Sequence, residues 1–470
     1  MSTTQRGVAE SGWSRPLAVT IAGAFFLEIF DGTVLVTAAP RIAGDFGVSP
    51  DAVGIAVTAY LCAVAAMIPL SGWLARRFGS RRTFLFAVVL FALASVCCAA
   101  SPALWVLAGA RVLQGIAGSM MVPVGNLIVL GNAAKHQLVR AVAYLTWPAL
   151  AAPVVAPFVG GLITDTIGWH WIFLVNVPIA AALFVASWFV VPRDAPQEPP
   201  RLDVLGFAVA AIGIIALVLG LQWVVDPPLW PVGAGLLVVA VGSAALTIVR
   251  GRRVPGAILD FRAYRFPTYR LTNGSGTIYR AGVLSAPFLV PLLFQSGFGW
   301  SAVDAGAMLI WLFLGNLGIK PLTTPILKAI GFRWMIASAT VVVAASFVAI
   351  ALLPRTAPIA LTAVVLLVSG VARSVGFTGY VTIQFADVPK ELMNGANTVA
   401  TTFNQLSQGL GVAVAAAAVA VAGLVEAAGT EAAVRTAFIA MAVLLLASLA
   451  GVLALPRNAA AHLTARPADT

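Results

Sequence analysis

Fourteen long apolar runs divide this 470-residue sequence and leave little of it for a soluble fold. A helix that crosses a bilayer needs roughly 20 mostly apolar residues, and most of these runs supply them. The chain is 60% hydrophobic and 10% charged, whereas a soluble protein has about 25% charged residues. We therefore expect an all-α polytopic membrane protein. The predicted spans are 17–39, 52–71, 83–100, 103–130, 141–164, 171–191, 204–224, 230–249, 270–295, 303–327, 334–353, 358–385, 395–425 and 433–455.

The connections between these runs alternate in charge. Basic residues gather in every second connection, as in 76–82 and 250–265, while the others carry acids such as Asp165 and few bases. Because cytoplasmic loops hold the excess of lysine and arginine, both termini are expected in the cytoplasm. Membrane orientation thus accounts for the net charge of +11, and no long basic tail indicates binding of nucleic acid.

Two breaks indicate how the spans are grouped. The proline-rich, charged linker 192–202 follows the sixth run, and the stretch 250–269 follows the eighth. We expect an N-terminal six-helix bundle at 1–200, two additional transmembrane helices at 201–255 and a C-terminal six-helix bundle at 256–470. Two such bundles with a cavity between them form a parallel-repeat architecture common among transporters.

Two carboxylates lie in the middle of the first run, within FFLEIFDGTVLV. Glu28 and Asp31 are spaced i and i+3, so on a helix they share a face. They repel each other and are poorly solvated there, and at least one is expected to exchange a proton near neutral pH. A structural ion pair with a nearby arginine, or misplacement of the span, are the alternatives.

Four bases also lie within apolar runs: Arg111, Arg280, Lys320 and Arg373. A charge in lipid costs a few kcal/mol or more, so such residues usually face a cavity or a partner. Either the acids pair with these bases across the two halves, or the surplus positive charge receives an anionic group of a substrate. Snorkelling toward a helix end is the alternative for Arg111, Lys320 and Arg373. Weaker cavity candidates, equally explained by hydrogen bonds between helices, are Asn126, Gln295 and Asn316.

Two further stretches are candidates for a conformational role: a loop with glycine and arginine after the second run, and a fifth run that contains proline and glycine. In GWLARRFGSRR, after the second run, glycine permits close packing and a sharp turn, and the arginines can reach helix ends or lipid phosphates. The alternative is a plain cytoplasmic loop; its candidate residues are Gly72, Arg77, Gly79, Arg81 and Arg82. In the fifth run, proline kinks the helix and glycine allows close helix approach. The residues concerned include Pro153, Pro157, Gly160 and Gly161.

Together these motifs resemble the fourteen-spanner drug:proton antiporter family of the major facilitators, over about 20–455. The stretch RVLQG at Arg111 resembles an R-x-x-Q-G motif whose arginine the family links to proton transfer. The loop from Gly72 resembles a pattern that begins G-x-L-A-D-R-x-G, and it departs at Arg76, where the family usually has Asp. The fifth run resembles the antiporter signature G-P-x-x-G-G, with its first glycine replaced by Ala156. The opening E-x-x-D-G-T-V places Asp31 at the family's membrane-embedded acid.

The resemblance implies a major facilitator fold with two extra inserted helices. It implies proton-coupled export of amphipathic organic compounds by alternating access, with Asp31, Glu28 and Arg111 in proton coupling. It further implies a monomer in the cell inner membrane, whose partners are protons, a small-molecule substrate and the bilayer. Export or facilitated transport of an anionic metabolite or lipid-like substrate stays open, as does a membrane receptor that does not transport.

No cofactor or enzyme activity is expected. The three cysteines fall inside apolar runs without CxxC spacing and are predicted to be small buried residues. The three histidines lie far apart, at or beyond the ends of runs, which argues against a metal site. The chain carries no G-x-x-x-x-G-K-[ST] loop for nucleotide phosphates.

Overall fold

The computed structural model describes residues 14–132, 144–145, 152, 155–156, 159–193, 201–224, 228–254, 256–425 and 429–456. The regular elements in these ranges are helices, most of them long and apolar. Their bounds are α1 Arg15–Phe46, η1 Pro50–Val53, α2 Gly54–Phe78, α3 Ser80–Ala99, α4 Leu104–Asn132, α6 His170–Leu174, α7 Asn176–Val190, α8 Val204–Trp223, α9 Trp230–Arg253, η3 Phe261–Arg265, α10 Pro267–Leu284, α11 Ala286–Leu292, η4 Leu293–Gly297, α12 Ala302–Gly318, α13 Lys320–Leu352, α14 Ile359–Gln384, α15 Lys390–Val425 and α16 Gly429–Leu453.

Within the described ranges, 12 helices are long and apolar enough to cross a membrane, and α12 is a shorter apolar helix. The predicted tenth and eleventh spans meet inside α13, where Gly331 interrupts the helical backbone. The predicted fifth span falls mostly on residues that the structure does not describe, and so do Pro153 and Pro157. An all-helical membrane protein is therefore confirmed, while the count of fourteen spans stays a prediction.

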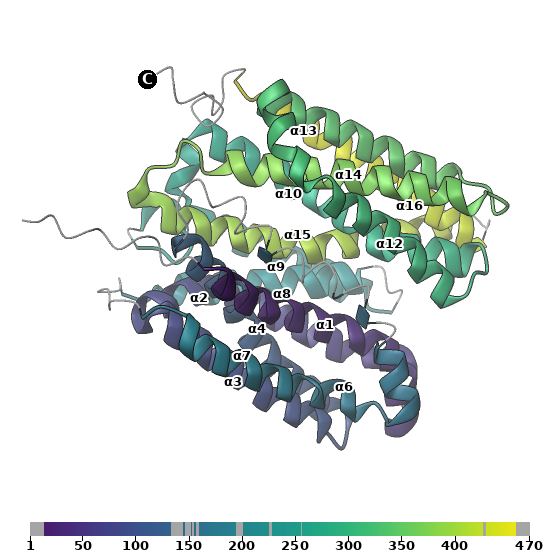
Figure 1. The fold of residues 1–470 in the computed structure, drawn as a ribbon, viewed down its shortest axis with the longest axis horizontal. Helices are drawn as coiled ribbons and strands as arrows, with labels where there is room; N and C mark the ends of the chain where they lie inside the picture. The colour runs from purple at the N-terminus through teal and green to yellow at the C-terminus, as the bar shows by residue number, and fades with distance from the viewer. Residues whose placement is uncertain are drawn as a thin grey trace, which may run out of the picture. The chain divides into compact units, whose positions relative to one another are not determined.

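The chain separates into two compact units, Met1–Leu202 and Asp203–Thr470. In the first unit α2 and α3 pack along α4, and α7 packs along α1 and α3 (Figure 1). In the second unit α13 packs along α14 and α16, while α10 contacts α14, α15 and α16. The α8–α9 pair contacts α15 and η3, so these two helices belong to the second unit. The three-part division into 1–200, 201–255 and 256–470 stays a prediction.

Each unit contains a sharp helix-to-helix turn at one glycine. Gly79 alone separates α2 from α3, with φ +89°, and Gly331 breaks α13 with φ +72°; side chains rarely adopt these angles. Two residues after each glycine an arginine donates to a backbone carbonyl at the end of the unit's last described helix. Arg81 donates to Trp188 O, and Arg333 donates to Leu455 O at 3.3 Å. Both turns are therefore fastened to a distant part of their own unit.

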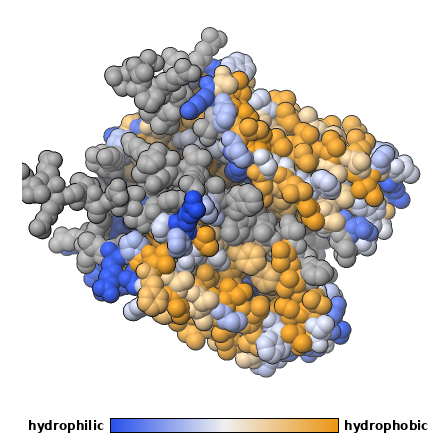
Figure 2. Space-filling model, viewed as in Figure 1, coloured by the Kyte–Doolittle hydropathy of each residue, from blue (hydrophilic) through white to orange (hydrophobic). Residues whose placement is uncertain are grey.

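Large apolar side chains cover the outer faces of the helices. Phe189 is 81% exposed and Val238 is 73% exposed, and Figure 2 shows apolar surface over much of the visible described residues. Such surfaces suit hydrocarbon rather than water. Cys62 and Cys98 are buried as predicted, but the prediction was wrong for Cys97, which is exposed. Neighbouring positions on a helix point about 100° apart, so Cys97 and Cys98 face different surroundings.

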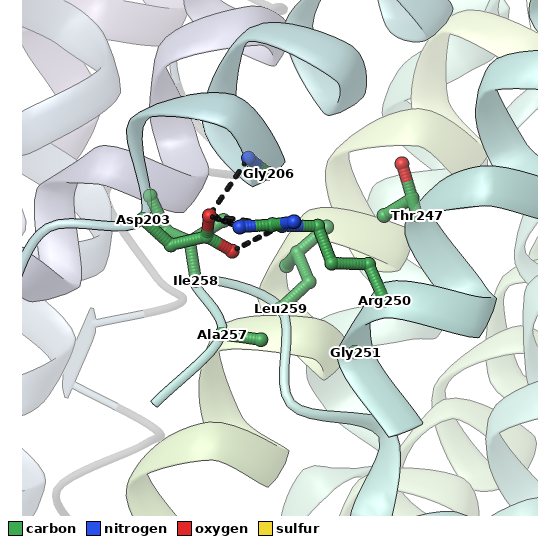
Figure 3. Close-up of a pocket in the computed structure, with 8 residues that line it drawn as sticks. All are labelled: Asp203, Gly206, Thr247, Arg250, Gly251, Ala257, Ile258 and Leu259. Carbon is green, nitrogen blue, oxygen red and sulfur yellow. Dashed lines mark hydrogen bonds and ion pairs between the residues drawn. The ribbon is translucent and has the colours of Figure 1, made fainter. Parts of the chain in front are cut away.

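The α8–α9 pair is closed at its base by an ion pair (Figure 3). The Asp203 carboxylate caps α8 by accepting a hydrogen bond from Gly206 N–H at 2.9 Å. It also accepts hydrogen bonds from Arg250 Nε at 2.9 Å and Nη2 at 2.6 Å. Partial burial acts to raise the pKa of Asp203, but the hydrogen bonds from Arg250 and Gly206 outweigh it and hold that pKa below its ordinary value. A small pocket beside the pair is also lined by Ile258 and Leu259, so the hairpin base contacts the chain that leads into η3.

Candidate functional site

The first unit buries an ion pair between Asp31 of α1 and Arg111 of α4. Both side chains are 0% exposed, and Arg111 Nη1 donates to Asp31 Oδ2. Gln114, one helical turn after Arg111, connects the two, since its Oε1 accepts from Arg111 Nη1 at 2.6 Å and its Nε2 donates to Asp31 Oδ1 at 2.9 Å. The R-x-x-Q spacing therefore aims a cation and an amide at the same carboxylate.

Two more helices contribute to this pair. Asn176, at the start of α7, donates from Nδ2 to Asp31 Oδ1 at 2.6 Å. Ser95 of α3 accepts from Gln114 Nε2 at 2.8 Å and from Asn176 Nδ2 at 3.4 Å. The Asp31 carboxylate thus accepts hydrogen bonds from three side chains. We call Asp31, Ser95, Arg111, Gln114 and Asn176 the Asp31 network.

The Asp31 network is not fully satisfied. Arg111 Nε and Nη2 and Asn176 Oδ1 are buried without a hydrogen-bond partner. The Arg111 guanidinium instead lies over the Tyr60 ring of α2, 4.2 Å from its centroid, which partly compensates the charge. An unmet buried donor costs about 1–3 kcal/mol. The network therefore retains donors that another arrangement of these helices could satisfy.

Glu28 lies one turn before Asp31 but in different surroundings. Its Oε2 is buried without a hydrogen-bond partner, as is Tyr60 Oη. Both groups border Gly118 of α4, where an added Cβ would lie 3.5 Å from Glu28 Cδ and 3.2 Å from Tyr60 Oη. Among the described residues Glu28 forms no ion pair, whereas Asp31 does. Of the two acids that lie close together in the sequence, Asp31 is thus paired with an arginine and Glu28 is not.

The glycine-containing motifs lie at helix contacts and turns. Gly160 packs close to α1, since an added Cβ would lie 2.6 Å from Thr37 Oγ1, while Gly161 faces open space. In the loop after α2, Arg81 lies over the Trp188 ring, 5.2 Å from its centroid. The other candidates of this loop lie at the end of α2 and the start of α3: Gly72 is half-buried, and Arg77 and Arg82 are exposed.

The second unit holds the remaining candidates. Arg280 of α10 and Arg373 of α14 are buried, and Lys320 Nζ donates to Thr378 Oγ1 at 3.2 Å. Asn316 is buried on α12, whereas Gln295 is exposed in η4; Asn126, in the first unit, is half-buried on α4. Asp31 pairs with a base of its own unit, so the pairing across halves considered from the sequence is not what this structure contains.

Sequence reasoning did not assign Ser95, Asn176 or Tyr60 to the site. The available signal was weak, since each is a single polar residue in an apolar run, as in FLVNVPIA for Asn176. Such residues often bond only to their own helix, as Ser71 Oγ does to Ile68 O. Which of them reach a neighbouring carboxylate depends on helix packing that the sequence does not display.

Comparison with known proteins assigns the fold to a family. The sequence model of the Major Facilitator Superfamily matches residues 21–412. The chain belongs to the Major Facilitator Superfamily. Relatives with the provisional name multidrug resistance protein MdtD match it from Cronobacter sakazakii (36% identity over 401 residues, 84% of each chain) and Pectobacterium atrosepticum (34% over 397 residues, 84% of this chain and 85% of the relative).

A solved structure gives the same result for the fold. The human organic anion transporter MFSD10 superposes with a TM-score of 0.66 at 14% identity, covering 93% of this chain and 99% of that one. Membership of the Major Facilitator Superfamily confirms the predicted fold class and the resemblance found in the sequence. The protein is a multi-pass membrane transporter, and the Asp31 network lies within the part that the superfamily model matches.

Proposed function

We propose that this transporter exports amphipathic organic compounds in exchange for protons. The provisional name of the relatives supports the choice of substrate class, because it assigns them to multidrug resistance. The buried Asp31–Arg111 pair supports the proton as coupling ion, because ionisable residues inside membrane helices mark proton relays and ion pathways. We further propose an inner-membrane monomer with both termini in the cytoplasm, as the distribution of arginine and lysine indicates.

Proton binding to Asp31 is the central step of this proposal. The ionised carboxylate attracts Arg111 and accepts from Gln114 and Asn176, so it ties α1 to α4 and α7. A protonated Asp31 is neutral and can accept fewer hydrogen bonds, which weakens all three links together. Arg111 then carries an uncompensated charge and drives a change in helix packing. A proton carrying its charge inward through 100 mV contributes about 2.3 kcal/mol to this cycle.

Glu28 is assigned the second titrating position. Its Oε2 has no partner, and it is one helical turn from Asp31, so a proton on Glu28 has a short path to the Asp31 network. The neighbouring Tyr60 Oη is a hydroxyl able to pass a proton or to hydrogen-bond the carboxyl. Coupling in this scheme depends on both carboxyls, with Asp31 controlling helix packing and Glu28 controlling proton access.

Alternating access requires each bundle to move as a body. The contacts from the turn at Gly79 serve this in the first unit, because Arg81 fastens the start of α3 to the end of α7, and Thr83 Oγ1 donates to Leu74 O of α2 at 3.2 Å. We assign Arg81 this fastening role and propose that Arg77 and Arg82, which are exposed, contact lipid phosphates.

The test compares Asp31→Asn with Asp165→Asn in energised inverted membrane vesicles. Asp165 is an exposed carboxylate of the same unit, so its variant is the matched control. We expect Asp31→Asn to abolish proton-driven accumulation of amphipathic dyes and dye-induced proton release, while Asp165→Asn retains both. Proton-driven accumulation at the wild-type rate in correctly inserted Asp31→Asn protein would remove Asp31 from the coupling step.

A further inference from the structure

The second unit buries two arginines that lack a carboxylate partner. Arg280 on α10 is 1% exposed and Arg373 on α14 is 9% exposed. Among the described residues, the ion pairs of this unit use other arginines, namely Arg250, Arg262, Arg355 and Arg435. Three buried guanidinium nitrogens therefore have no acceptor: Nε and Nη2 of Arg280 and Nη1 of Arg373.

Two tyrosines connect these arginines across the contact between α10 and α14. Tyr279 Oη donates to the backbone carbonyl of Arg373 at 3.2 Å, and the Tyr279 and Tyr380 ring centroids are 5.1 Å apart. An added Cβ at Gly276 would lie 3.1 Å from Tyr380 Cδ1 and 3.3 Å from Arg280 Nη1. The side chains of Tyr279, Tyr380 and Arg280 therefore lie next to one another, and the Tyr279 hydroxyl reaches the backbone of Arg373. We call Tyr279, Arg280, Arg373 and Tyr380 the arginine–tyrosine cluster.

The residues around the cluster add a further positive charge and supply no negative charge that balances the arginines. Lys320 is tied to α14 through Thr378, five positions after Arg373. The carboxylates of this unit whose side chains are described lie at helix ends: Asp203, Asp260, Asp304, Asp387 and Glu431. Within its described membrane-spanning segments, the second unit therefore carries buried positive charge that is not balanced by a carboxylate.

The cost of this arrangement indicates a ligand. An arginine at the centre of a bilayer costs about 2.5–3.5 kcal/mol even on the mildest scales, and each unmet donor adds about 1–3 kcal/mol. The structural arginine Arg435, by contrast, donates to the backbone carbonyls of Ala351 and Leu353 and to the Glu431 carboxylate. A carboxylate or sulfonate supplies acceptors that match the guanidinium fork, and the tyrosine faces offer apolar contact with a polar edge for an attached organic group.

We propose that the arginine–tyrosine cluster binds the anionic group of an amphipathic organic substrate. This inference rests on the proposed export function and names a substrate class for it, compounds with a carboxylate or sulfonate on an apolar body. In the conformation described here the arginines are closed off, so the anion enters when the helices of the transport cycle separate. Arg280 and Arg373 are then the residues that select anionic over cationic compounds.

Three probes with one apolar body test the charge preference: 1-naphthylacetate, its neutral amide and 1-naphthylmethylammonium. Binding to the purified full chain in neutral detergent is measured for wild type, Arg280→Gln, Arg373→Gln and Arg270→Gln. Arg270 is exposed on the same helix as Arg280 and is the matched control. We expect Arg280→Gln and Arg373→Gln to bind the carboxylate about tenfold more weakly, as loss of one charged hydrogen bond implies. Binding of the neutral amide is expected to stay unchanged, and the amine is expected to bind as well as before or more tightly, because a repelling positive charge is removed. Arg270→Gln is expected to bind all three probes as wild type does.

The melting temperature distinguishes a binding role of Arg280 from a structural role, because loss of a structural arginine would lower it. Because no described carboxylate depends on Arg280, Arg280→Gln is expected to melt at the same temperature as wild type or higher. A large fall in melting temperature, or equal weakening of the carboxylate and the amide, would overturn the inference. Arg280→Lys keeps the charge without the fork and is expected to recover part of the carboxylate binding.

Two further experiments distinguish this inference from binding of a lipid headgroup and from failure of the proposed export function. Phosphatidylglycerol in neutral phosphatidylcholine nanodiscs tests the lipid source of the same chemistry. Competition with the carboxylate probe in wild type, lost in Arg280→Gln, would assign the cluster to a lipid headgroup and overturn the substrate assignment. In energised inverted vesicles, wild type that accumulates no dye refutes the proposed export function. Retained dye export with carboxylate binding that is indifferent to Arg280 refutes the inference alone.

Discussion

The ion pair between Asp31 and Arg111 yields a prediction about stability that depends only on its burial. Both side chains are 0% exposed, so neither charge can turn to water when its partner is removed. Breaking a buried pair by removing one partner costs about 3–5 kcal/mol. We therefore expect Asp31→Asn and Arg111→Gln to lower the free energy of unfolding by that amount each.

The double variant Asp31→Asn/Arg111→Gln should be more stable than either single variant. Two amides in this site are neutral and remain within reach of Gln114 and Asn176, so the residual loss is that of weaker hydrogen bonds, about 1–2 kcal/mol. The double variant is thus expected to be more stable than each single variant by about 1–4 kcal/mol. Unfolding of the four purified proteins in mixed detergent micelles, with denaturing detergent as the variable, measures these differences.

The same four proteins separate a structural pair from a coupling pair. A pair with only a structural role predicts that the double variant regains proton-driven export along with its stability. The proposed role predicts a folded protein that exchanges substrate down a gradient without proton-driven accumulation. If the two single losses simply add in the double variant, Asp31 and Arg111 do not interact in the membrane protein, and the buried ion pair does not explain the loss of stability.

Two further predictions concern the supports of the site. Asp203→Asn is expected to lower the melting temperature at pH 7, and the difference from wild type should shrink as the pH falls below about 4, because a lowered pKa stabilises only the ionised form. A difference that grows in acid would contradict the role of the Arg250 ion pair. Gly79→Ala and Gly331→Ala should each cost about 1–3 kcal/mol of unfolding free energy, since both positions have positive φ. Denaturant titration would detect this loss, and unchanged midpoints would show that the turns relax freely.

Much of the fold could be predicted because lipid imposes a simple rule on sequence. A helix that crosses hydrocarbon must be apolar along its length, so apolar runs mark helices even without knowledge of their neighbours. The ends of the helices were harder to predict. The first run ends before Pro40, where a missing N–H argues against a helix, yet α1 continues through Pro40 to Phe46. The remaining backbone hydrogen bonds of α1 outweigh the single one that Pro40 removes.

The charged centre of the site was also visible in the sequence, whereas its shell was not. Asp31 and Arg111 are conspicuous because their charges are costly in an apolar run. Ser95 and Asn176 are not, because a small polar side chain in a membrane helix costs little when it bonds to its own backbone. Gln295 is the opposite case, a polar residue that looked like part of a cavity and lies exposed in a π-helical turn.

The glycine turns of the two units determine which substitutions the chain can accept there. In both, a glycine is followed two residues later by an arginine, but the acceptors are the carbonyls of a tryptophan and of a leucine. A backbone carbonyl is present whatever the side chain, so the arginine keeps its acceptor when the tryptophan or the leucine is substituted. The glycine has no such latitude, since its backbone angle admits few other residues. Selection on these two turns is therefore expected to act on the glycine and the arginine, and not on the residue that supplies the carbonyl.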